Sequence, residues 1–286
     1  MAGAPRPRVA FSGEPGAFAE DALRAAFVDP DVTAVGGFRE VVEAVLERRV
    51  DAGVLPIENL VNGTVRENED LLLEHEVEIV AEVVVPVRLC LAALPGERLE
   101  GIERVYSHIQ ALGQADRFLR TRPWSLLTTY NTAGAGKMIV ERGERGAAAV
   151  LSPRAAELLG LEVLASGIQN VAENRTRFVV VVPPGGSLAP GWLRAPVADH
   201  GVRTTLIAAV ADEPGSLHRV LGVLAHHGVN MSMIESRPLK GRAWEYVFWI
   251  DLDAGTGEPG PAAAIAELRA FVPMLRVLGT YRRAEP

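Results

Sequence analysis

The feature that most constrains the fold of this chain is a recurring unit: a short apolar segment, a loop of turn-forming residues, and an amphipathic segment. Val9–Phe11, for example, runs into such a loop at 12–17 and then into apolar residues at helical spacing over 18–27. Further apolar segments that read as strands lie at 52–57, 77–94, 101–106, 125–130 and 147–151. Repeated units of this kind predict an α/β domain from about residue 8 to residue 182.

Polar side chains follow three of the predicted strands at the point where each strand ends, which is where open α/β sheets bind ligands. They are Glu58 and Asn59 after 52–57, Ser107, His108 and Gln110 after 101–106, and Asn131 and Thr132 after 125–130. Each group also has a simpler interpretation, because the first can be a solvated turn, a single histidine is usually structural, and Asn131 or Thr132 can cap a helix. Both interpretations stay open for these residues.

The segment Asn174–Phe178 places a hydroxyl, a cation and an aromatic ring directly before four valines, 179–182. Because successive side chains of a strand point to opposite faces, Thr176 and Phe178 share one face, while Arg177 takes the other face or a twisted edge. An anionic substrate could meet both groups there. An edge strand with a surface ion pair is the alternative.

Prolines and glycines at 183–186 and 190–191 cannot continue a strand or a helix, so they predict a domain boundary. Beyond it, strand patterns at 204–210, 229–234, 245–252 and 274–281 alternate with helical patterns at 216–227 and 261–271. This order is βαββαβ, the ferredoxin-like unit. Such a sheet exposes one face and an edge unless a partner covers them, which favours pairing between subunits.

Composition excludes several classes of function. The chain is 48% hydrophobic and 23% charged, as expected of a globular protein, and its formal net charge of -7 argues against binding nucleic acid. No apolar run is long enough to span a membrane, and the N-terminus lacks the apolar core of a signal peptide, so we expect a cytoplasmic protein. Cys90 is the only cysteine, so neither an intrachain disulfide nor a multi-cysteine zinc site is expected.

Six motifs together resemble prephenate dehydratase with a C-terminal ACT regulatory domain, over nearly the whole chain. The first four belong to the family's catalytic domain and the last two to its ACT domain, in the family's own order. They are Pro56–Asn59, Ser107–Leu112, Asn131–Ala133, Asn174–Phe178, Asp212–Leu217 and Glu235–Pro238.

The resemblance implies a catalytic domain at 8–183 with two α/β lobes similar to a periplasmic binding protein, a linker at 184–202, and a ferredoxin-like ACT domain at 203–282. The strand at 176–182 would return from the second lobe to the first. The implied reaction is that of a carbon–oxygen lyase in phenylalanine biosynthesis: prephenate loses water and carbon dioxide to give phenylpyruvate. The family uses neither a metal nor an organic cofactor.

By resemblance, Thr176 donates a hydrogen bond to the leaving hydroxyl, Arg177 binds a substrate carboxylate and Phe178 supplies an apolar wall. The polar residues at the three strand ends complete the lining: Glu58, Asn59, Ser107, His108, Gln110, Asn131 and Thr132. The chain departs from the family pattern at Leu60, Ile109, Phe18–Ala19 and Ser216, where serine, proline, a hydroxyl-bearing pair and alanine are usual.

The resemblance also implies feedback inhibition by L-phenylalanine, held between paired ACT domains of a homodimer or homotetramer. Five residues match the effector motifs: Gly215, Leu217, Asn230, Glu235 and Ser236. Two alternatives remain. Arogenate dehydratase acts on the amino analogue of prephenate, and a two-lobed amino-acid sensor would bind without turnover.

Overall fold

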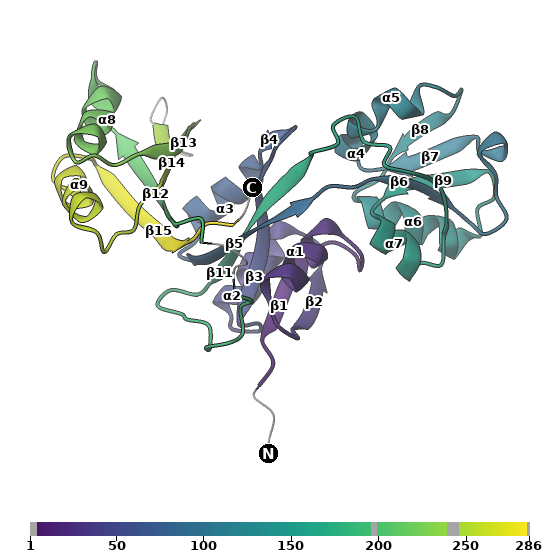
Figure 1. The fold of residues 1–286 in the computed structure, drawn as a ribbon, viewed down its shortest axis with the longest axis horizontal. Coiled ribbons are helices and arrows are strands. Elements are labelled where there is room, and N and C mark those ends of the chain that lie inside the picture. The colour runs from purple at the N-terminus through teal and green to yellow at the C-terminus, as the bar shows by residue number, and fades with distance from the viewer. Residues whose placement is uncertain (1–4, 196–198, 239–245, 285–286) are drawn as a thin grey trace.

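The structure is a computed structural model, and it describes residues 5–195, 199–238 and 246–284. The strands of these residues form three sheets, each the centre of one structural unit. Figure 1 shows the C-terminal domain, the first lobe and the second lobe arranged in that order across the molecule.

The first lobe has its sheet in the order β2-β1-β3-β11-β5, with β4 paired to β3. Its elements are β1 (Arg8–Ser12), α1 (Phe18–Ala26), β2 (Asp31–Val35), α2 (Phe38–Leu46), β3 (Ala52–Asn59), β4 (Gly63–Thr64), α3 (Arg66–Glu74), β5 (Glu78–Pro86) and β11 (Arg175–Val182). Helix α1 packs in the apolar cluster on one face of the sheet, and α2 and α3 pack in the cluster on the other face.

Strand β11 shows why the four-valine run is a central strand. Phe178, Val180 and Val182 belong to the apolar cluster on the α1 side, whereas Val179 and Val181 belong to the cluster on the α2 and α3 side. Both faces are therefore buried, and a continuous apolar run is the sequence that such a strand requires. A residue of odd number on β11 points to the α2 and α3 side.

The second lobe has its sheet in the order β10-β6-β9-β7-β8. Its elements are β6 (Cys90–Ala93), the 3-10 helix η1 (Leu99–Gly101), β7 (Arg104–Ser107), α4 (Ile109–Gln114), α5 (Asp116–Leu119), β8 (Ser125–Thr128), α6 (Thr132–Arg142), β9 (Ala147–Leu151), α7 (Pro153–Leu158) and β10 (Glu162–Ser166). Cys90 lies in its core, and burial raises the pKa of the thiol to about 11.

Two crossings connect the lobes, one from β5 to β6 and one from β10 to β11. The prediction that the 176–182 strand returns to the first lobe is confirmed, because β11 lies between β3 and β5 and is antiparallel to both. The polar side chains at the start of β11 therefore lie at the point where the chain leaves the second lobe.

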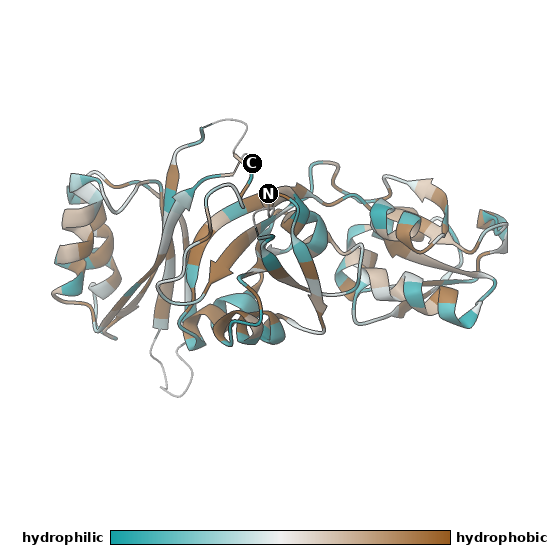
Figure 2. Cartoon of the chain, turned by 90° about the horizontal axis from the view of Figure 1, so that it is seen from below, coloured by the Kyte–Doolittle hydropathy of each residue, from teal (hydrophilic) through white to brown (hydrophobic). Residues whose placement is uncertain are grey.

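The C-terminal domain is the predicted βαββαβ unit, and the predicted fold class is thereby confirmed. Its elements are β12 (Val202–Val210), α8 (Ser216–His226), β13 (Met231–Pro238), β14 (Tyr246–Leu252), α9 (Pro259–Arg269) and β15 (Met274–Arg282), with the sheet order β13-β14-β12-β15. Figure 2 shows α8 and α9 on the side of this sheet that faces away from the first lobe.

The other face of the C-terminal sheet corrects an expectation from the sequence. Ile207, Val247, Trp249, Leu278 and Tyr281 of this sheet belong to the same apolar cluster as α2 and α3 of the first lobe. The face that was expected to need a partner subunit is thus covered by the first lobe of the same chain. Edge strand β13 is paired only on the β14 side within the described residues.

Two smaller features, the edge strands and a break in a helix, were not predicted. Strands β2 and β10 lie at sheet edges and are largely exposed, so their sequences lack the apolar runs that mark central strands. The helical segment that follows β7 is broken at Ala115, so it forms two short helices, α4 and α5. None of the described helices is both long and apolar enough to cross a bilayer.

Candidate active site

Thr176 lies at the start of β11 with 9% of its surface exposed. Its cross-strand neighbour on β3 is Asn59, whose Nδ2 donates to the Thr176 Oγ1 at 2.9 Å. The same amide group donates to Asn174 Oδ1 at 2.9 Å. None of the described residues accepts a hydrogen bond from the Thr176 hydroxyl, so its proton is free to be donated to a ligand.

Asn59 is itself fixed from both lobes. Its Oδ1 accepts the backbone N–H groups of Val61 and Asn62 at 3.1 and 3.0 Å, and it accepts Gln114 Nε2 of the second lobe at 3.4 Å. The side chain of Asn59 therefore cannot turn without breaking bonds on both sides. This fixed amide holds the Thr176 hydroxyl at the junction of the lobes.

A pocket of about 150 Å³ lies between the loop after β3, helix α4 and the chain that leads to β11. Three of its lining residues, Asn62, Gln114 and Asn174, are hydrogen-bonded to Asn59. Asn174 lines it with only 1% of its surface exposed, and none of the described residues pairs with its Nδ2. None of the described lining residues is charged; they are Val61, Asn62, Gln110, Gly113, Gln114, Gln169, Asn170, Val171 and Asn174. A buried amide without a partner costs free energy unless a ligand or water satisfies it.

The polar residues predicted at the strand ends of the second lobe have different roles in the structure. Gln110 lines the pocket, but Ser107 is fully buried and its Oγ donates to the Val150 carbonyl at 2.5 Å. His108 caps α4, because its Nδ1 accepts the backbone N–H of Gln110 at 3.3 Å, and burial lowers the pKa of its imidazole.

Asn131 caps α6 by accepting the backbone N–H of Gly134 at 2.5 Å. This is the simpler interpretation that the sequence left open for it. Thr132 begins the same helix and is half-buried. Within the described ranges, no group of three or more His, Cys, Asp or Glu side chains could hold a metal ion.

The loop between β1 and α1 bridges the lobes on another side. Glu14 accepts hydrogen bonds from Tyr130 at 2.8 Å and from Lys137 at 3.0 Å, and the bond from Tyr130 is the first reason that the pKa of Glu14 is lowered. Gly16 passes so close to Ala155 that a Cβ at Gly16 would lie 2.6 Å from the Ala155 Cα. The lobes are therefore in contact across this loop.

Two of the three residues predicted to carry the chemistry lie elsewhere. Phe178 is 2% exposed and packs in the core beneath α1, so it is not an exposed wall of the pocket. Arg177 points to the opposite side of the sheet from Thr176, where its Nη1 lies 3.0 Å from Asp251 Oδ2 and 3.3 Å from Glu82 Oε2. Strand alternation explains why Arg177 faces the other side of the sheet. Of the motif, Asn174 lines the pocket and Thr176 is linked to it through Asn59.

Comparison with known proteins decides the family. Residues 9–184 match the family described as prephenate dehydratase, and residues 204–270 match the ACT domain. The chain belongs to the prephenate dehydratase family. Arogenate dehydratase 1 of Petunia hybrida is 36% identical over 293 residues, covering 96% of this chain and 66% of the plant protein. The chain thus spans just under two thirds of that relative.

Two solved structures are similar over almost the whole chain, each with a TM-score of 0.84. Prephenate dehydratase from Arthrobacter aurescens, solved in complex with L-Phe, is 31% identical and matches over 97% of this chain and 90% of its own. A protein described as GqqA, a novel type of quorum quenching acylase, is 33% identical and matches over 98% of both chains.

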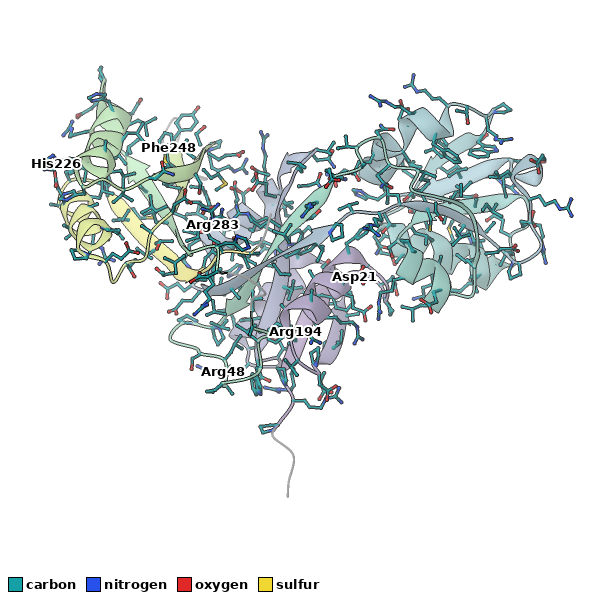
Figure 3. The ribbon with its side chains drawn as sticks, viewed as in Figure 1. Asp21, Arg48, Arg194, His226, Phe248 and Arg283 are labelled. Carbon is teal, nitrogen blue, oxygen red and sulfur yellow. The ribbon has the colours of Figure 1, made fainter. Side chains whose placement is uncertain are left out.

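The ACT domain of this prephenate dehydratase family member has a pocket of its own, of about 340 Å³. Gly215 and Leu217, predicted from the effector motif, line it together with Tyr246 and Phe248 of β14, which the sequence did not suggest. Figure 3 places Phe248 on the ACT domain, on the far side of the first lobe from the second lobe. The pocket is therefore distant from Thr176.

The other three predicted effector residues lie outside the lining of this pocket. Asn230 donates to Asp253 at 2.8 Å, and Glu235 accepts a hydrogen bond from Thr64 of the catalytic domain. Ser236 is exposed and lies opposite Phe248 in the β13–β14 ladder. Because neighbouring residues of a strand face opposite sides, Glu235 faces the catalytic domain and Ser236 the helix side.

Proposed function

We propose that this protein catalyses the decarboxylating dehydration of prephenate to phenylpyruvate, a step of phenylalanine biosynthesis. The observation that carries the proposal is the Thr176 hydroxyl, which is held by Asn59 and keeps a free proton. The same Asn59 is hydrogen-bonded to three residues that line an uncharged pocket between the lobes. Membership of the prephenate dehydratase family supports the reaction type.

In the proposed mechanism the Thr176 O–H donates a hydrogen bond to the ring hydroxyl of the substrate as the C–O bond breaks. The hydroxyl leaves as water with one added proton, the ring carboxylate leaves as carbon dioxide, and the electron pair of the broken C–C bond completes the aromatic ring. The pKa of an alcohol is too high for Thr176 to act as a free acid, so the proton transfer is concerted or relayed.

We infer prephenate rather than arogenate as the preferred substrate. Arogenate carries an ammonium group, and a buried ammonium needs a carboxylate partner. The polar side chains among the described lining residues of the pocket are all neutral amides, which suit a keto group. The Petunia relative named as an arogenate dehydratase makes arogenate the second candidate.

Parallel turnover assays test the substrate. Purified protein is incubated with prephenate and with arogenate, and phenylpyruvate and phenylalanine are quantified. We expect a kcat/KM for prephenate about 10-fold or more above that for arogenate, since one unpaired buried charge costs more than 1.4 kcal/mol. Equal or reversed values would contradict the preference, and no turnover of either would favour a non-catalytic sensor.

The surroundings of Thr176 suit an acylase mechanism less well than a dehydratase mechanism. Acyl transfer to a threonine needs a base within hydrogen-bond reach of the hydroxyl. The group that contacts the Thr176 Oγ1 is the amide nitrogen of Asn59, which donates and cannot accept a proton. The geometry therefore favours dehydration over the activity described for the GqqA structure.

We further propose that L-phenylalanine binds the ACT pocket and inhibits the distant catalytic site. Support comes from the aromatic lining of Tyr246 and Phe248, which suits an aromatic amino acid, and from the solved relative in complex with L-Phe. A second subunit pairing along β13 would bring further polar groups to the pocket. Calorimetry on the full chain should show phenylalanine binding that Leu217→Glu abolishes and that Arg219→Gln, outside the described pocket lining, retains.

A further inference from the structure

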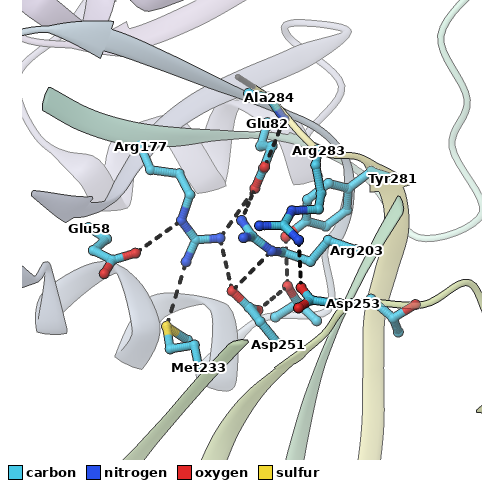
Figure 4. A network of polar contacts seen from close by, with 12 residues as sticks. Glu58, Glu82, Arg177, Arg203, Met233, Asp251, Asp253, Tyr281, Arg283 and Ala284 are labelled. Atoms are coloured by element: carbon cyan, nitrogen blue, oxygen red, sulfur yellow. Dashed lines mark hydrogen bonds and ion pairs between the residues drawn. The ribbon is translucent and has the colours of Figure 1, made fainter. Parts of the chain in front are cut away.

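A buried cluster of charges joins the catalytic strand β11 to the ACT sheet, as Figure 4 shows. Arg203 of β12 lies 2.6 Å from Glu82 of β5 and 3.7 Å from Asp251 of β14. Arg177 lies between the same two carboxylates, at 3.3 Å from Glu82 and 3.0 Å from Asp251. Two cations from different domains therefore share two anions from different domains.

The four side chains named above are closed to solvent and their charges balance, and Arg177 Nε also lies 3.3 Å from Oε2 of the half-exposed Glu58. The side chains of Arg177, Arg203, Glu82 and Asp251 are 9%, 11%, 2% and 1% exposed. Thr205 donates to Asp251 Oδ1 at 2.6 Å, and its hydroxyl also contacts the Tyr281 hydroxyl. In such a site each cation requires its anion, because an unpaired buried charge has no water to stabilise it. A displacement of Asp251 is therefore expected to displace the guanidinium of Arg177.

Arg177 connects the cluster to the candidate active site through the backbone. It is the chain neighbour of Thr176, and across the β3 ladder Arg177 pairs with Glu58 while Thr176 pairs with Asn59. The β3 ladder shifts register between Arg177 and Phe178, directly after this pair of neighbours, and the β5 ladder shifts between Val180 and Val181. A shift of the guanidinium is thus transmitted to the bond between Asn59 and Thr176.

A second contact reaches the same place from β13. Glu235 accepts a hydrogen bond from Thr64, and Thr64 on β4 is the ladder partner of Glu58. The ACT sheet therefore contacts β11, which carries Thr176, through Arg177, and it reaches β3, which carries Asn59, through β4. By contrast, Arg276 of β15 donates to the carbonyls of Leu72, His75 and Val77, which precede β5 at the end of the ladder away from Thr176.

We propose that Asp251 of the ACT domain is a positioning residue for the catalytic strand, and that through Arg177 it transmits the effector state of the ACT domain to Thr176. Arg177 then serves as the link between the domains and not as a ligand of the substrate carboxylate. This inference rests on the proposed dehydratase activity and its inhibition by phenylalanine.

Asp251→Asn tests the link in the full-length protein, because it keeps the shape of the side chain and removes its charge. We expect the ratio of kcat/KM without phenylalanine to kcat/KM at saturating phenylalanine to fall about 10-fold or more, within the usual range of allosteric coupling. The dissociation constant of phenylalanine, measured by calorimetry, should change less than about 3-fold, which would separate binding from inhibition.

Arg276→Gln is the matched control. It removes another charged side chain that bridges the same two domains, so it weakens docking of the ACT sheet to a similar degree, but it lies away from Thr176. Phenylalanine should inhibit this variant as strongly as it inhibits the wild-type protein. Wild-type inhibition in folded Asp251→Asn, or equal loss in both variants, would overturn the proposal.

If Asp251→Asn alone does not fold, Asp251→Asn/Arg203→Gln replaces it, since the pair removes one charge of each sign and restores the balance. The same loss of inhibition is expected. Hydrogen exchange of amides 175–178 gives a readout independent of turnover: it should be faster in either Asp251 variant than in Arg276→Gln, and equal rates would overturn the proposal. A wild-type protein without dehydratase activity would instead reject the proposed function and leave this exchange comparison valid.

Discussion

At the scale of single residues, Thr176 differs from an ordinary strand threonine in how its hydroxyl is held. The Asn59 amide occupies an acceptor position of the oxygen and leaves the proton available to a ligand. We predict that Thr176→Ala lowers kcat about 100-fold or more with little change in KM, because the lost hydrogen bond is made chiefly to the departing oxygen. Steady-state kinetics measure this.

Thr176→Ser keeps a hydroxyl on the same backbone atom and should retain far more of the activity than Thr176→Ala. Thermal unfolding of both variants establishes that the fold is intact. A folded Thr176→Ala protein with a kcat near that of wild type would contradict the assigned role.

Glu69 on α3 is a second residue with a measurable signature. It is fully buried beneath the ACT sheet, none of the described residues donates a hydrogen bond to its carboxyl oxygens, and its nearest cation, Arg237, lies 3.7 Å away. Burial, reinforced by Glu235, raises the pKa of Glu69 to about 8. The folded protein therefore holds a proton there that the unfolded chain releases above about pH 4.3.

This bound proton sets the sign of the pH dependence of the free energy of unfolding. Between about pH 4.3 and 8 the folded state binds one proton more than the unfolded state, so this group lowers the free energy of unfolding by up to about 1.4 kcal/mol for each unit of rising pH. Urea unfolding from pH 5 to 8 should show Glu69→Gln gaining stability relative to wild type as pH rises. Glu67→Gln, on the exposed side of α3, should run parallel to wild type.

At the scale of elements, strand alternation predicted correctly that Arg177 faces away from Phe178, but not what covers that face. The covering groups, Glu82 and Asp251, lie about 100 and 70 residues from Arg177 in the chain, and pairing over such distances depends on the whole fold. His108 and Asn131 show a related limit: the residue types that cap a helix are also those that bind ligands, so only geometry separates the roles.

The contact between β15 and β5 gives a test at this scale. A Cβ at Gly279 would lie 2.0 Å from the Ile79 carbonyl oxygen, so the two backbones approach more closely than any side chain allows. We predict that Gly279→Ala lowers the free energy of unfolding by about 1–3 kcal/mol, since the ACT sheet must move off the first lobe. Chemical denaturation measures it.

Gly222→Ala is the control for the glycine substitution itself. Gly222 lies within α8 with no atom within 4 Å of its would-be Cβ, so alanine should stabilise the helix by about 0.5–1 kcal/mol. Loss of stability in Gly222→Ala, or none in Gly279→Ala, would contradict the close-packed interface.

At the scale of the whole molecule, domain boundaries in the sequence and packing units in the structure do not coincide. One apolar cluster contains residues of α2, α3 and the ACT sheet, while the second lobe has two clusters of its own. The proline- and glycine-rich linker predicted a separable C-terminal domain, yet Trp249 of that domain is 1% exposed against the first lobe. The hydrophobic pattern of a sequence identifies which face of an element is buried, but it does not identify the surface that covers that face.

The ACT domain and the first lobe should therefore unfold as one cooperative unit, and the second lobe as another, because cooperativity follows shared core. Trp249→Ala removes a side chain whose truncation costs about 3–5 kcal/mol and should lower the transition of the combined unit. Leu119→Ala, in the core of the second lobe, should lower the other transition. Phenylalanine should raise the first transition in differential scanning calorimetry, since a ligand stabilises the unit that it binds. An ACT domain that melts alone, ahead of both lobes, would show that the shared cluster does not couple the domains and would remove the physical basis for transmission from Asp251 to Thr176.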